Sequence, residues 1–243
     1  MQLQDLLYSQ GFGPRRVCLG LVQHGLVTVD GAPATDPHAQ VDPEHLTFTV
    51  EGKEWTYHAK AYLMLHKPLG YECSQRPSAW PSIYTLLPAP LRQRPNKGST
   101  PGVQAIGRLD QDTTGLLLLC DDGTFIHRMS SPKHHVPKVY EVTCADAVAP
   151  GQVERLLAGV VLDDDPKPVR AAACVATGPH ALRLTLTEGK YHQVKRMLAA
   201  VGNRVVGLHR SRIGVLEIPP ELHPGAWRWL TREQVSTISN RGQ

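Results

Sequence analysis

The sequence has no long apolar run. Its longest, Leu116–Cys120, is far below the ~20 residues that a membrane-spanning helix needs. The first ten residues, MQLQDLLYSQ, include an acid and no basic stretch, so we expect no signal peptide. These absences lead us to expect a soluble, cytoplasmic protein that does not engage a membrane.

Cysteine is scarce and unpaired in the sequence. There are five cysteines, an odd number, and no CxxC pair. This pattern excludes a disulfide framework and a zinc signature, and it fits a reducing cytosol. The glycine-rich loops GxGxxG and GxxxxGK, which bind dinucleotides and nucleotide phosphates, are also missing. We therefore expect no cofactor and no metal.

Acidic residues are absent from three long stretches, 73–109, 123–140 and 189–216, although the net charge of the chain is only +4. Residues 1–58 hold three basic and seven acidic residues, a net charge of −4, so the rest of the chain carries +8. If the acid-free stretches converge in space, they form a positive surface suited to a phosphate backbone. The alternative is a scattering of solvated lysines and arginines.

Residues 1–58 are expected to form a small module of their own. The apolar spacing predicts a first helix, which Gly11–Pro14 breaks, and a second helix from Arg15 to His24. A strand and a hairpin turn at Asp30-Gly31 follow. The residues that we expect these two helices to bury are Leu3, Leu6, Leu7, Val17, Leu21 and Val22.

Two short helices that lead into a hairpin resemble the alpha-L RNA-binding module of a ribosomal protein and of several RNA-modifying enzymes. The resemblance implies that Arg15 and Arg16, clustered at the start of the second helix, contact RNA. The net charge departs from the usual pattern, as do Gln2 and Pro14, which stand where a basic residue and a serine are expected. We therefore expect the module to orient RNA rather than to supply most of the affinity.

Residues 59–243 are expected to form a second, larger domain. The pattern predicts helices at 150–158 and 189–201 and a long loop at 75–103, where prolines and glycines cluster. Short strands with few crossover helices indicate an α+β domain on a mixed, mainly antiparallel sheet. The predicted strands are 61–66, 115–120, 139–144, 182–187 and 204–209.

The densest motif is GRLDQDTTGLLLL, residues 107–119. It places a glycine, a basic side chain and the carboxylate of Asp110 in a loop that enters an apolar strand. A carboxylate at a strand edge can be held rigidly and still face a pocket, as a covalent nucleophile requires. The alternative is an Asp/Thr turn that is capped by its own side chains.

Two further motifs combine basic and aromatic residues. Lys138 and Tyr140 are two apart in a predicted strand, so they should face the same side of the sheet, although Tyr140 could equally be a core residue. In the helix predicted at 189–201, Lys195 lies at the margin of the apolar face and Arg196 points nearly opposite. The alternative is an ordinary amphipathic helix with snorkelling side chains. The residues expected on its apolar face are Tyr191, Val194, Leu198 and Val201.

The order of these motifs resembles the RsuA-type small-subunit ribosomal RNA pseudouridine synthases. The matching segments are KPxG, GRLDxDTTGL, KxYxV, EGxYHQVKRM and HRxRIG, at residues 67–70, 107–116, 138–142, 188–197 and 209–214. With the N-terminal module included, the resemblance covers nearly the whole chain. It implies that residues 59–243 are a catalytic domain that isomerises uridine to pseudouridine.

The resemblance also implies roles for individual residues. Asp110 matches the nucleophile, Lys195 matches its basic partner, and Tyr140 matches the tyrosine that packs on the target base. Ile213 matches an aliphatic residue of the pocket, and Arg108 could fill the space that the flipped base leaves. The further residues that we expect to bind the RNA substrate are Lys67, Lys138, Arg196, Arg210 and Arg212, with Arg15 and Arg16 of the module. The implied partner is ribosomal RNA in a small-subunit assembly intermediate, and the implied enzyme is a monomer.

Three alternatives stay open. Asp110-Gln-Asp-Thr-Thr114 also satisfies the DxDxT pattern of magnesium phosphohydrolases of the haloacid dehalogenase type, although that fold expects the motif near the start of the chain. The chain could instead be an RNA-binding assembly factor that has the fold without the activity. Relatives that act on large-subunit RNA share the aspartate loop, so the choice of subunit is also open.

Overall fold

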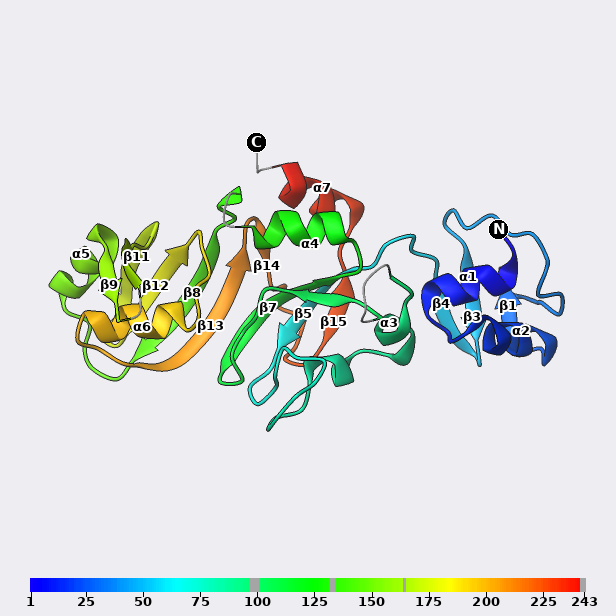
Figure 1. Cartoon of the computed structure of the whole chain (residues 1–243), viewed down its shortest axis with the longest axis horizontal. Helices are drawn as coiled ribbons and strands as arrows, with labels where there is room; N and C mark the ends of the chain where they lie inside the picture. The colour runs from blue at the N-terminus through cyan, green and yellow to red at the C-terminus, as the bar shows by residue number, and fades with distance from the viewer. Residues whose placement is uncertain (97–100, 132–133, 164, 241–243) are drawn as a thin grey trace. The chain divides into compact units, whose positions relative to one another are not determined.

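The computed structural model describes residues 1–96, 101–131, 134–163 and 165–240 (Figure 1). The chain divides into two compact units. The first comprises Met1–Ala61, Leu87–Gln104 and Cys120–Asp122, and the second comprises Tyr62–Leu86, Ala105–Leu119 and Gly123–Gln243. The boundary expected between residues 58 and 59 stays a prediction. In the described part of the chain, no helix combines the length and the apolarity that are needed to cross a bilayer.

Two helices and a small sheet form the N-terminal part of the first unit. Helix α1 (Leu3–Gln10) ends at Gly11, whose φ of 90° is left-handed, and α2 (Arg15–Gln23) follows. The hairpin turn at Asp30-Gly31 is confirmed, because both residues have the positive φ, 47° and 81°, that this tight turn needs. The sheet has the order β2-β1-β3-β4, with bounds Ala32–Pro33, Val27–Val29, Thr47–Val50 and Lys53–Thr56.

The prediction for the buried face of α2 was partly wrong. Val22 is buried as expected, but Val17 is 45% exposed and Cys18 is fully buried. Cys18 and Val22 are four residues apart and therefore share one side of the helix. Val17 precedes Cys18 by one residue, so its side chain points to a different side. The apolar face of α2 is thus rotated by about one residue from the expected one.

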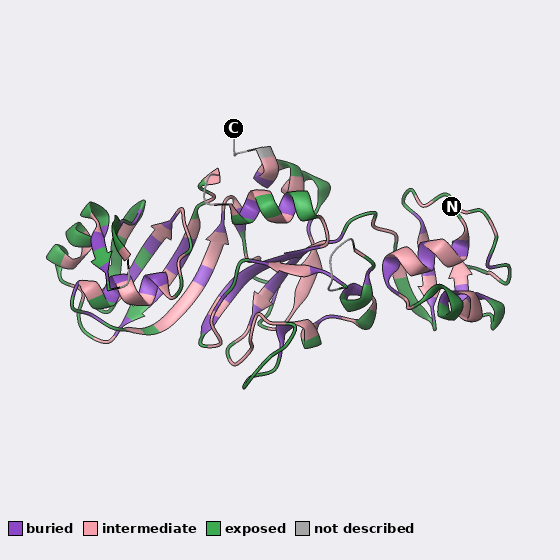
Figure 2. Cartoon of the chain, in the orientation of Figure 1, coloured by how far each residue is buried: buried purple, intermediate pink, exposed green. Residues whose placement is uncertain are grey.

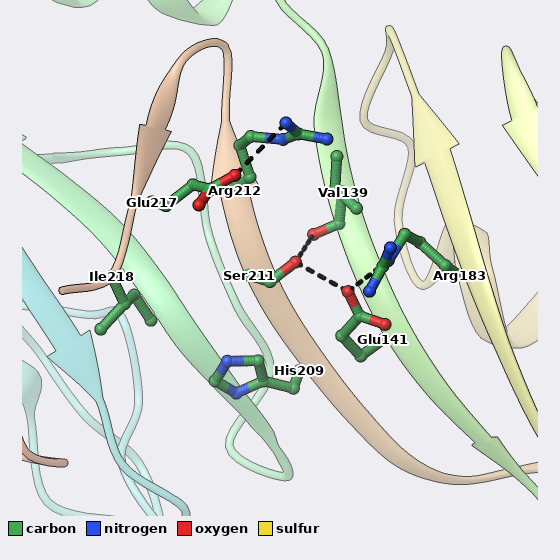
Figure 3. A pocket seen from close by; sticks show the side chains of 8 residues that line it. All are labelled: Val139, Glu141, Arg183, His209, Ser211, Arg212, Glu217 and Ile218. Carbon is green, nitrogen blue, oxygen red and sulfur yellow. Dashed lines mark hydrogen bonds and ion pairs between the residues drawn. The ribbon is translucent and has the colours of Figure 1, made fainter. Parts of the chain in front are cut away.

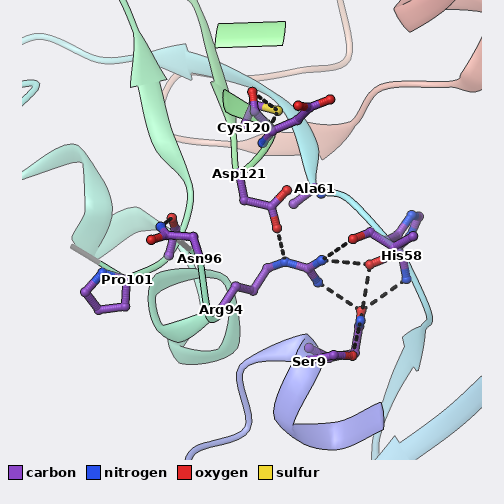
Figure 4. Close-up of polar contacts among 12 residues, drawn as sticks. Ser9, His58, Ala61, Arg94, Asn96, Pro101, Cys120 and Asp121 are labelled. Carbon is purple, nitrogen blue, oxygen red and sulfur yellow. Dashed lines mark hydrogen bonds and ion pairs between the residues drawn. The ribbon is translucent and has the colours of Figure 1, made fainter. Parts of the chain in front are cut away.

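A buried arginine joins distant segments of the first unit (Figure 4). Arg94 is 2% exposed, and its Nε donates to Oδ2 of Asp121 at 2.6 Å. Its Nη1 donates to Oε1 of Gln10 at 2.9 Å, and its Nη2 donates to the carbonyl of His58 at 2.7 Å. The other carboxylate oxygen of Asp121 accepts the amide of Ala61 at 2.8 Å. One guanidinium therefore connects segments that are more than 80 residues apart.

The second unit is built on a nine-stranded sheet, in which β11-β12-β8-β13-β7-β5-β15 are neighbours in that order (Figure 1). Strand β13 pairs parallel with β7 and antiparallel with β8, while β12 is antiparallel to both β8 and β11. The α+β class with a mixed, mainly antiparallel sheet is thus confirmed. The bounds in this order are Ala173–Gly178, Ala181–Leu186, Lys138–Cys144, Val205–Ile213, Thr113–Cys120, Tyr62–Lys67 and Trp227–Trp229; β14 (Leu216–Glu217) pairs with β13, and β6 (Gln104–Ile106) pairs with β7.

All five predicted strands are present, and the helix predicted at 150–158 is α5 (Pro150–Ala158). The helix predicted at 189–201 is shorter, because α6 spans Gln193–Ala200 and His192 before it is left-handed with a φ of 49°. Tyr191 is therefore outside the helix and 76% exposed, so its expected place on an apolar face was wrong.

The stretch 75–103 is less irregular than predicted. It contains a 3-10 helix, η1 (Ile83–Leu86), and a short helix, α3 (Ala89–Gln93), while residues 97–100 lie outside the described part. Pro90 falls in the first turn of α3, where a missing N–H breaks no intrahelical bond, so proline does not prevent a helix here.

Buried apolar residues line the sheet on both sides. Figure 2 shows a nearly continuous buried run along β7, which has one partly exposed residue in eight. On one face of the sheet, β8 and β12 pack with α5, α6 and β9 (Val160–Leu162), which pairs with β10 (Asp165–Val169). Elsewhere in the second unit, α4 (Gly123–Ser130) contacts α7 (Arg232–Asn240), where Arg128 donates to the carbonyl of Ser239.

Candidate active site

The loop that carries Asp110 lies between β6 and β7 and is held by the backbone. The amide of Thr113 donates to the carbonyl of Asp110 at 3.0 Å and closes the turn. The amide of Gly70, just beyond the end of β5, donates to the carbonyl of Gln111 at 2.8 Å. The carboxylate of Asp110 remains 27% exposed. The structure therefore combines a fixed backbone with an accessible acid, as a nucleophile requires.

Both oxygens of Asp110 face potential hydrogen-bond donors. Nζ of Lys195, on α6, donates to Oδ2 at 3.1 Å, and Nε2 of His192 lies 3.3 Å from Oδ1. The ammonium of Lys195 is also 2.7 and 2.9 Å from the two oxygens of Asp112. Burial lowers the pKa of Lys195, but the hydrogen bonds to Asp112 and Asp110 outweigh it, so the pKa is raised. Lys195 is therefore held as a cation beside Asp110.

Sequence reasoning missed two members of this cluster, Asp112 as an ion partner of Lys195 and His192 as a neighbour of Asp110. The signal for His192 was present in YHQVKRM, where it stands three residues before Lys195. It went unused because that segment was expected to be helical throughout. The left-handed backbone of His192 instead turns the chain just before α6 begins.

Tyr140 and Ile213 lie on the same face of the sheet as α6. Tyr140 is 8% exposed and shares a buried cluster with Leu109, the residue before Asp110. In the pairing of β8 with β13, Tyr140 is opposite Arg210 and Lys138 is opposite Ile213. Because paired residues share a face, the strands bring these side chains to one side, as predicted for Lys138 and Tyr140.

Two residues that we expected to touch RNA are buried, which corrects that prediction. Lys67 is fully buried, and its Nζ donates to the carbonyls of Pro68 at 3.0 Å and Thr113 at 2.8 Å. Burial lowers the pKa of Lys67 despite the nearby anionic groups. Arg210 is 3% exposed, and its Nε donates to the carbonyl of Leu116 at 2.8 Å. Both side chains donate to backbone carbonyls of β7.

Gly115 explains why Arg210 lies so close to β7. It has a φ of 116°, and a Cβ at this position would lie 2.2 Å from the carbonyl oxygen of Arg210. Only glycine allows β7 and β13 to approach this closely. Sequence reasoning could not see this contact because Gly115 and Arg210 meet only when β13 pairs with β7.

Figure 3 shows Arg212 on the same side of the sheet as Val139. It pairs with Val139, which faces away from Tyr140 because consecutive strand residues alternate. Arg212 lines a polar pocket there, with Nη1 3.3 Å from Oε1 of Glu217, and Arg183 in the same pocket bonds Glu141 at 2.8 Å. The structure therefore does not bring Arg212 to Asp110.

The remaining predicted RNA contacts differ in accessibility. Arg108 is exposed, two residues before Asp110. Lys138 is half-buried and donates to the carbonyl of Val136 at 3.0 Å; burial, and then the charge of Arg210, lowers its pKa. Arg196 donates to the carbonyl of Tyr191 at 3.1 Å.

In the first unit, Arg15 and Arg16 are exposed. Arg15 pairs with Asp5 at 3.0 Å and lies 4.2 Å over the ring of Tyr8. Across the ranges that the structure describes, no three His, Cys, Asp or Glu side chains gather as metal ligands do.

Comparison with known proteins shows which families the chain is similar to. Residues 61–200 match the RNA pseudouridylate synthase family, and residues 1–46 match the S4 domain. Ribosomal small subunit pseudouridine synthase A of Escherichia coli is 38% identical over 235 residues, which cover 96% of this chain and 98% of that one. An uncharacterized RNA pseudouridine synthase of Bacillus subtilis is 39% identical over 243 residues, with 98% of each chain covered. A crystal structure of pseudouridylate synthase aligns with a TM-score of 0.67 at 34% identity, covering 98% of this chain and 99% of that chain.

Proposed function

The chain belongs to the RNA pseudouridylate synthase family, and on this premise we propose that it isomerises a uridine of small-subunit ribosomal RNA with Asp110 as nucleophile. The observation that carries the proposal is the pairing of both Asp110 oxygens, one with Lys195 and one with His192, on a backbone loop that leaves the carboxylate accessible. The relatives that bear a small-subunit name support the choice of RNA. Membership of this family excludes the alternative that the chain is a magnesium phosphohydrolase.

The proposed reaction breaks the N1–C1′ bond of uridine, rotates the uracil and joins C5 to C1′. The proton lost from C5 is balanced by the one gained at N1, so no oxidant or energy donor is consumed. The target base first leaves its stack, at a cost of a few kcal/mol. Asp110 must be ionised to attack, and the ammonium of Lys195 stabilises that charged form. Tyr140 packs on the base and helps remove the C5 proton, Ile213 lines the pocket, and Arg108 occupies the space that the base leaves.

The experiment that tests the function is pseudouridine mapping. Small- and large-subunit ribosomal RNA from a strain without the gene are compared with the same RNAs after incubation with the purified protein. We expect one new pseudouridine in the small-subunit RNA. A new site only in the large-subunit RNA would correct the substrate, and no site in either RNA would favour a silent assembly factor.

Partner and location follow from the same proposal. We propose that the protein acts as a cytoplasmic monomer on an assembly intermediate of the small subunit, because base flipping is least costly before the RNA is fully packed. We also propose that residues 1–58 form a separate module that orients this RNA, consistent with the S4 match and with the module's net charge of −4.

Lys195→Met is expected to slow pseudouridine formation roughly a hundredfold, the scale for loss of one preorganised electrostatic contact. The ammonium is 3.1 Å from Oδ2 of Asp110, so its removal takes away the positive charge that stabilises the attacking carboxylate. Initial rates of pseudouridine formation measure the loss. Lys195→Arg, which keeps the charge, should retain most of the wild-type rate. A Lys195→Met rate equal to that of wild type would remove Lys195 as the partner of Asp110.

Arg108→Ala is expected to weaken RNA binding several-fold and to reduce the slope of log affinity against log salt by about one, because the RNA then binds one cationic side chain fewer. Arg108 is suited to this test because it is exposed and lies in an acid-free stretch. Arg210 is unsuited, because its removal would disturb the interior. Arg170→Ala, exposed but outside the acid-free stretches, is the matched control and should leave the slope unchanged. Equal slopes for Arg108→Ala and wild type would exclude the contact.

A further inference from the structure

Two aromatic side chains are exposed to an unusual degree. Among the large apolar residues that the structure describes as exposed, Trp80 at 49% and Tyr191 at 76% are the aromatic ones. Aromatic rings are rare in this chain, at 6% of residues, and exposure of a ring to water is costly without a partner. Each of the two rings lies beside a residue that contacts Asp110 or the loop that carries it.

Trp80 lies beside the backbone that fixes this loop. A Cβ placed on Gly70 would be 3.8 Å from Cε3 of the Trp80 ring, which is van der Waals contact. The amide of the same Gly70 donates to the carbonyl of Gln111, the residue after Asp110. The indole therefore lies beside Gly70, which hydrogen-bonds the residue that follows the candidate nucleophile.

The backbone of the segment that carries Trp80 is held by hydrogen bonds. The carboxylate of Glu72 accepts the amides of Ser78 at 3.1 Å, Ala79 at 3.0 Å and Trp80 at 3.0 Å. The backbone hydrogen bonds from Ala79, Ser78 and Trp80 lower the pKa of Glu72 to about 2, so this anchor stays ionised at all physiological pH values. A backbone that is held in place before binding loses little entropy when a ligand arrives.

The second ring, Tyr191, lies against His192, a neighbour of the Asp110 carboxylate. Its ring stacks on His192 with centroids 3.7 Å apart and an interplanar angle of 20°. Nε2 of His192 in turn lies 3.3 Å from Oδ1 of Asp110. One face of the tyrosine ring is thus occupied by the imidazole, while three quarters of the residue remains exposed.

Both rings lie in stretches of sequence that carry basic and no acidic residues, although the carboxylate of Glu72 binds the backbone of Trp80. Trp80 lies in the acid-free stretch 73–109 with the exposed Arg76 and Arg108, and Tyr191 lies in the acid-free stretch 189–216. Basic side chains interleaved with exposed aromatic rings are the chemistry by which proteins hold single-stranded nucleic acid, since every base has a π face to stack on a ring. An apolar protein partner would bring no charge to match these arginines.

We propose that Trp80 and Tyr191 stack with unpaired nucleobases that neighbour the target uridine, so that the enzyme selects a uridine within a single-stranded segment. This inference rests on the proposed function and adds the conformation of the substrate RNA to it. It assigns the two rings to RNA flanking the flipped base, whereas Tyr140 packs on the flipped base itself.

The test compares a short single-stranded RNA with an RNA duplex of the same length as binding probes. Trp80→Ala and Tyr191→Ala should each weaken binding of the single strand roughly tenfold, the scale for loss of one stacked base, and leave duplex binding unchanged. Because stacking releases no counterions, the salt slope should stay that of wild type. Trp80→Phe and Tyr191→Phe should restore most of the affinity. Trp80→Phe should also remove part of the quenching of tryptophan fluorescence by the single strand.

Val175→Ala and Val206→Ala are the matched controls, since these side chains are 53% and 54% exposed but cannot stack. Wild-type affinity of the two alanine variants for the single strand would overturn the inference, as would an equal loss on the duplex or a changed salt slope. Pseudouridine mapping with the wild-type protein separates this result from the proposed function. If wild type forms pseudouridine and the alanine variants bind and react as wild type does, only the stacking inference fails.

Discussion

Asp110→Asn should reduce pseudouridine formation by roughly 10⁴-fold or more, the scale for removal of a catalytic nucleophile. Asparagine has nearly the size of aspartate, but its amide is neutral and a poor nucleophile. The backbone bonds of the loop, from Thr113 to residue 110 and from Gly70 to Gln111, do not involve the side chain, so the fold should persist. RNA affinity should stay close to wild type, because phosphate contacts elsewhere supply most of it. Tritium release from RNA labelled at C5 of uridine measures the loss.

Asp112→Asn is the matched control for this variant. Asp112 is in the same loop, 51% exposed, and shares the ammonium of Lys195 with Asp110. Its neutralisation leaves Lys195 free to pair with Asp110 alone, so the effect on the rate should be much milder. Pseudouridine formed by Asp110→Asn at a rate near that of Asp112→Asn, in protein shown free of wild-type enzyme, would refute the nucleophile assignment.

Arg94→Ala should lower the free energy of unfolding by about 3–5 kcal/mol, because it leaves one member of a buried ion pair without its partner. Both side chains of the pair are almost fully buried, with 3% of Arg94 and 4% of Asp121 exposed. The variant also removes the guanidinium donor from the oxygens of Gln10 and His58. Urea unfolding followed by circular dichroism and fluorescence measures the change.

The controls separate burial from charge pairing as such. Arg183→Ala breaks a pair with Glu141 of similar length, 2.8 Å, but the arginine side chain is 53% exposed, so the cost should be at most about 1 kcal/mol. The double variant Arg94→Met with Asp121→Leu should recover much of the stability, because neither charge is then buried alone. Equal unfolding midpoints for Arg94→Ala and Arg183→Ala would contradict the role assigned to the buried network.

The elements that could be predicted from the sequence are those set by local periodicity. The strand predicted at 182–187 is β12 within one residue at each end, and the helix predicted at 150–158 is α5 at its observed bounds. The missed strands have weaker patterns. Strand β10 contains two prolines, and all but one of its residues are at least partly exposed, so no apolar alternation marks it. The periodicity of apolar residues indicates which face of an element is buried. An edge strand buries too little apolar surface to produce such a pattern.

The site was predictable only where a motif carried it. Asp110, Lys195 and Tyr140 could be named from their motifs, whereas the sharing of Lys195 by Asp112, the position of His192 and the burial of Lys67 and Arg210 depend on contacts between distant segments. Charge counting placed Arg210 on a surface because a sequence does not reveal that β13 lies against Gly115. Tertiary contacts decide which basic residues face water.

The separation in sequence between Asp110 and its partner on α6 sets the order in which activity can appear during synthesis. Lys195 follows Asp110 by 85 residues, so a growing chain exposes the carboxylate long before the ammonium that pairs with it has been made. Strand β13, which lies beside β7 in the finished sheet, is translated later still. The Asp110 loop can therefore emerge next to ribosomal RNA without its partners, and a nascent chain halted before residue 195 should be catalytically inert. The pairing of Asp110 with Lys195 is therefore complete only after α6 has been made.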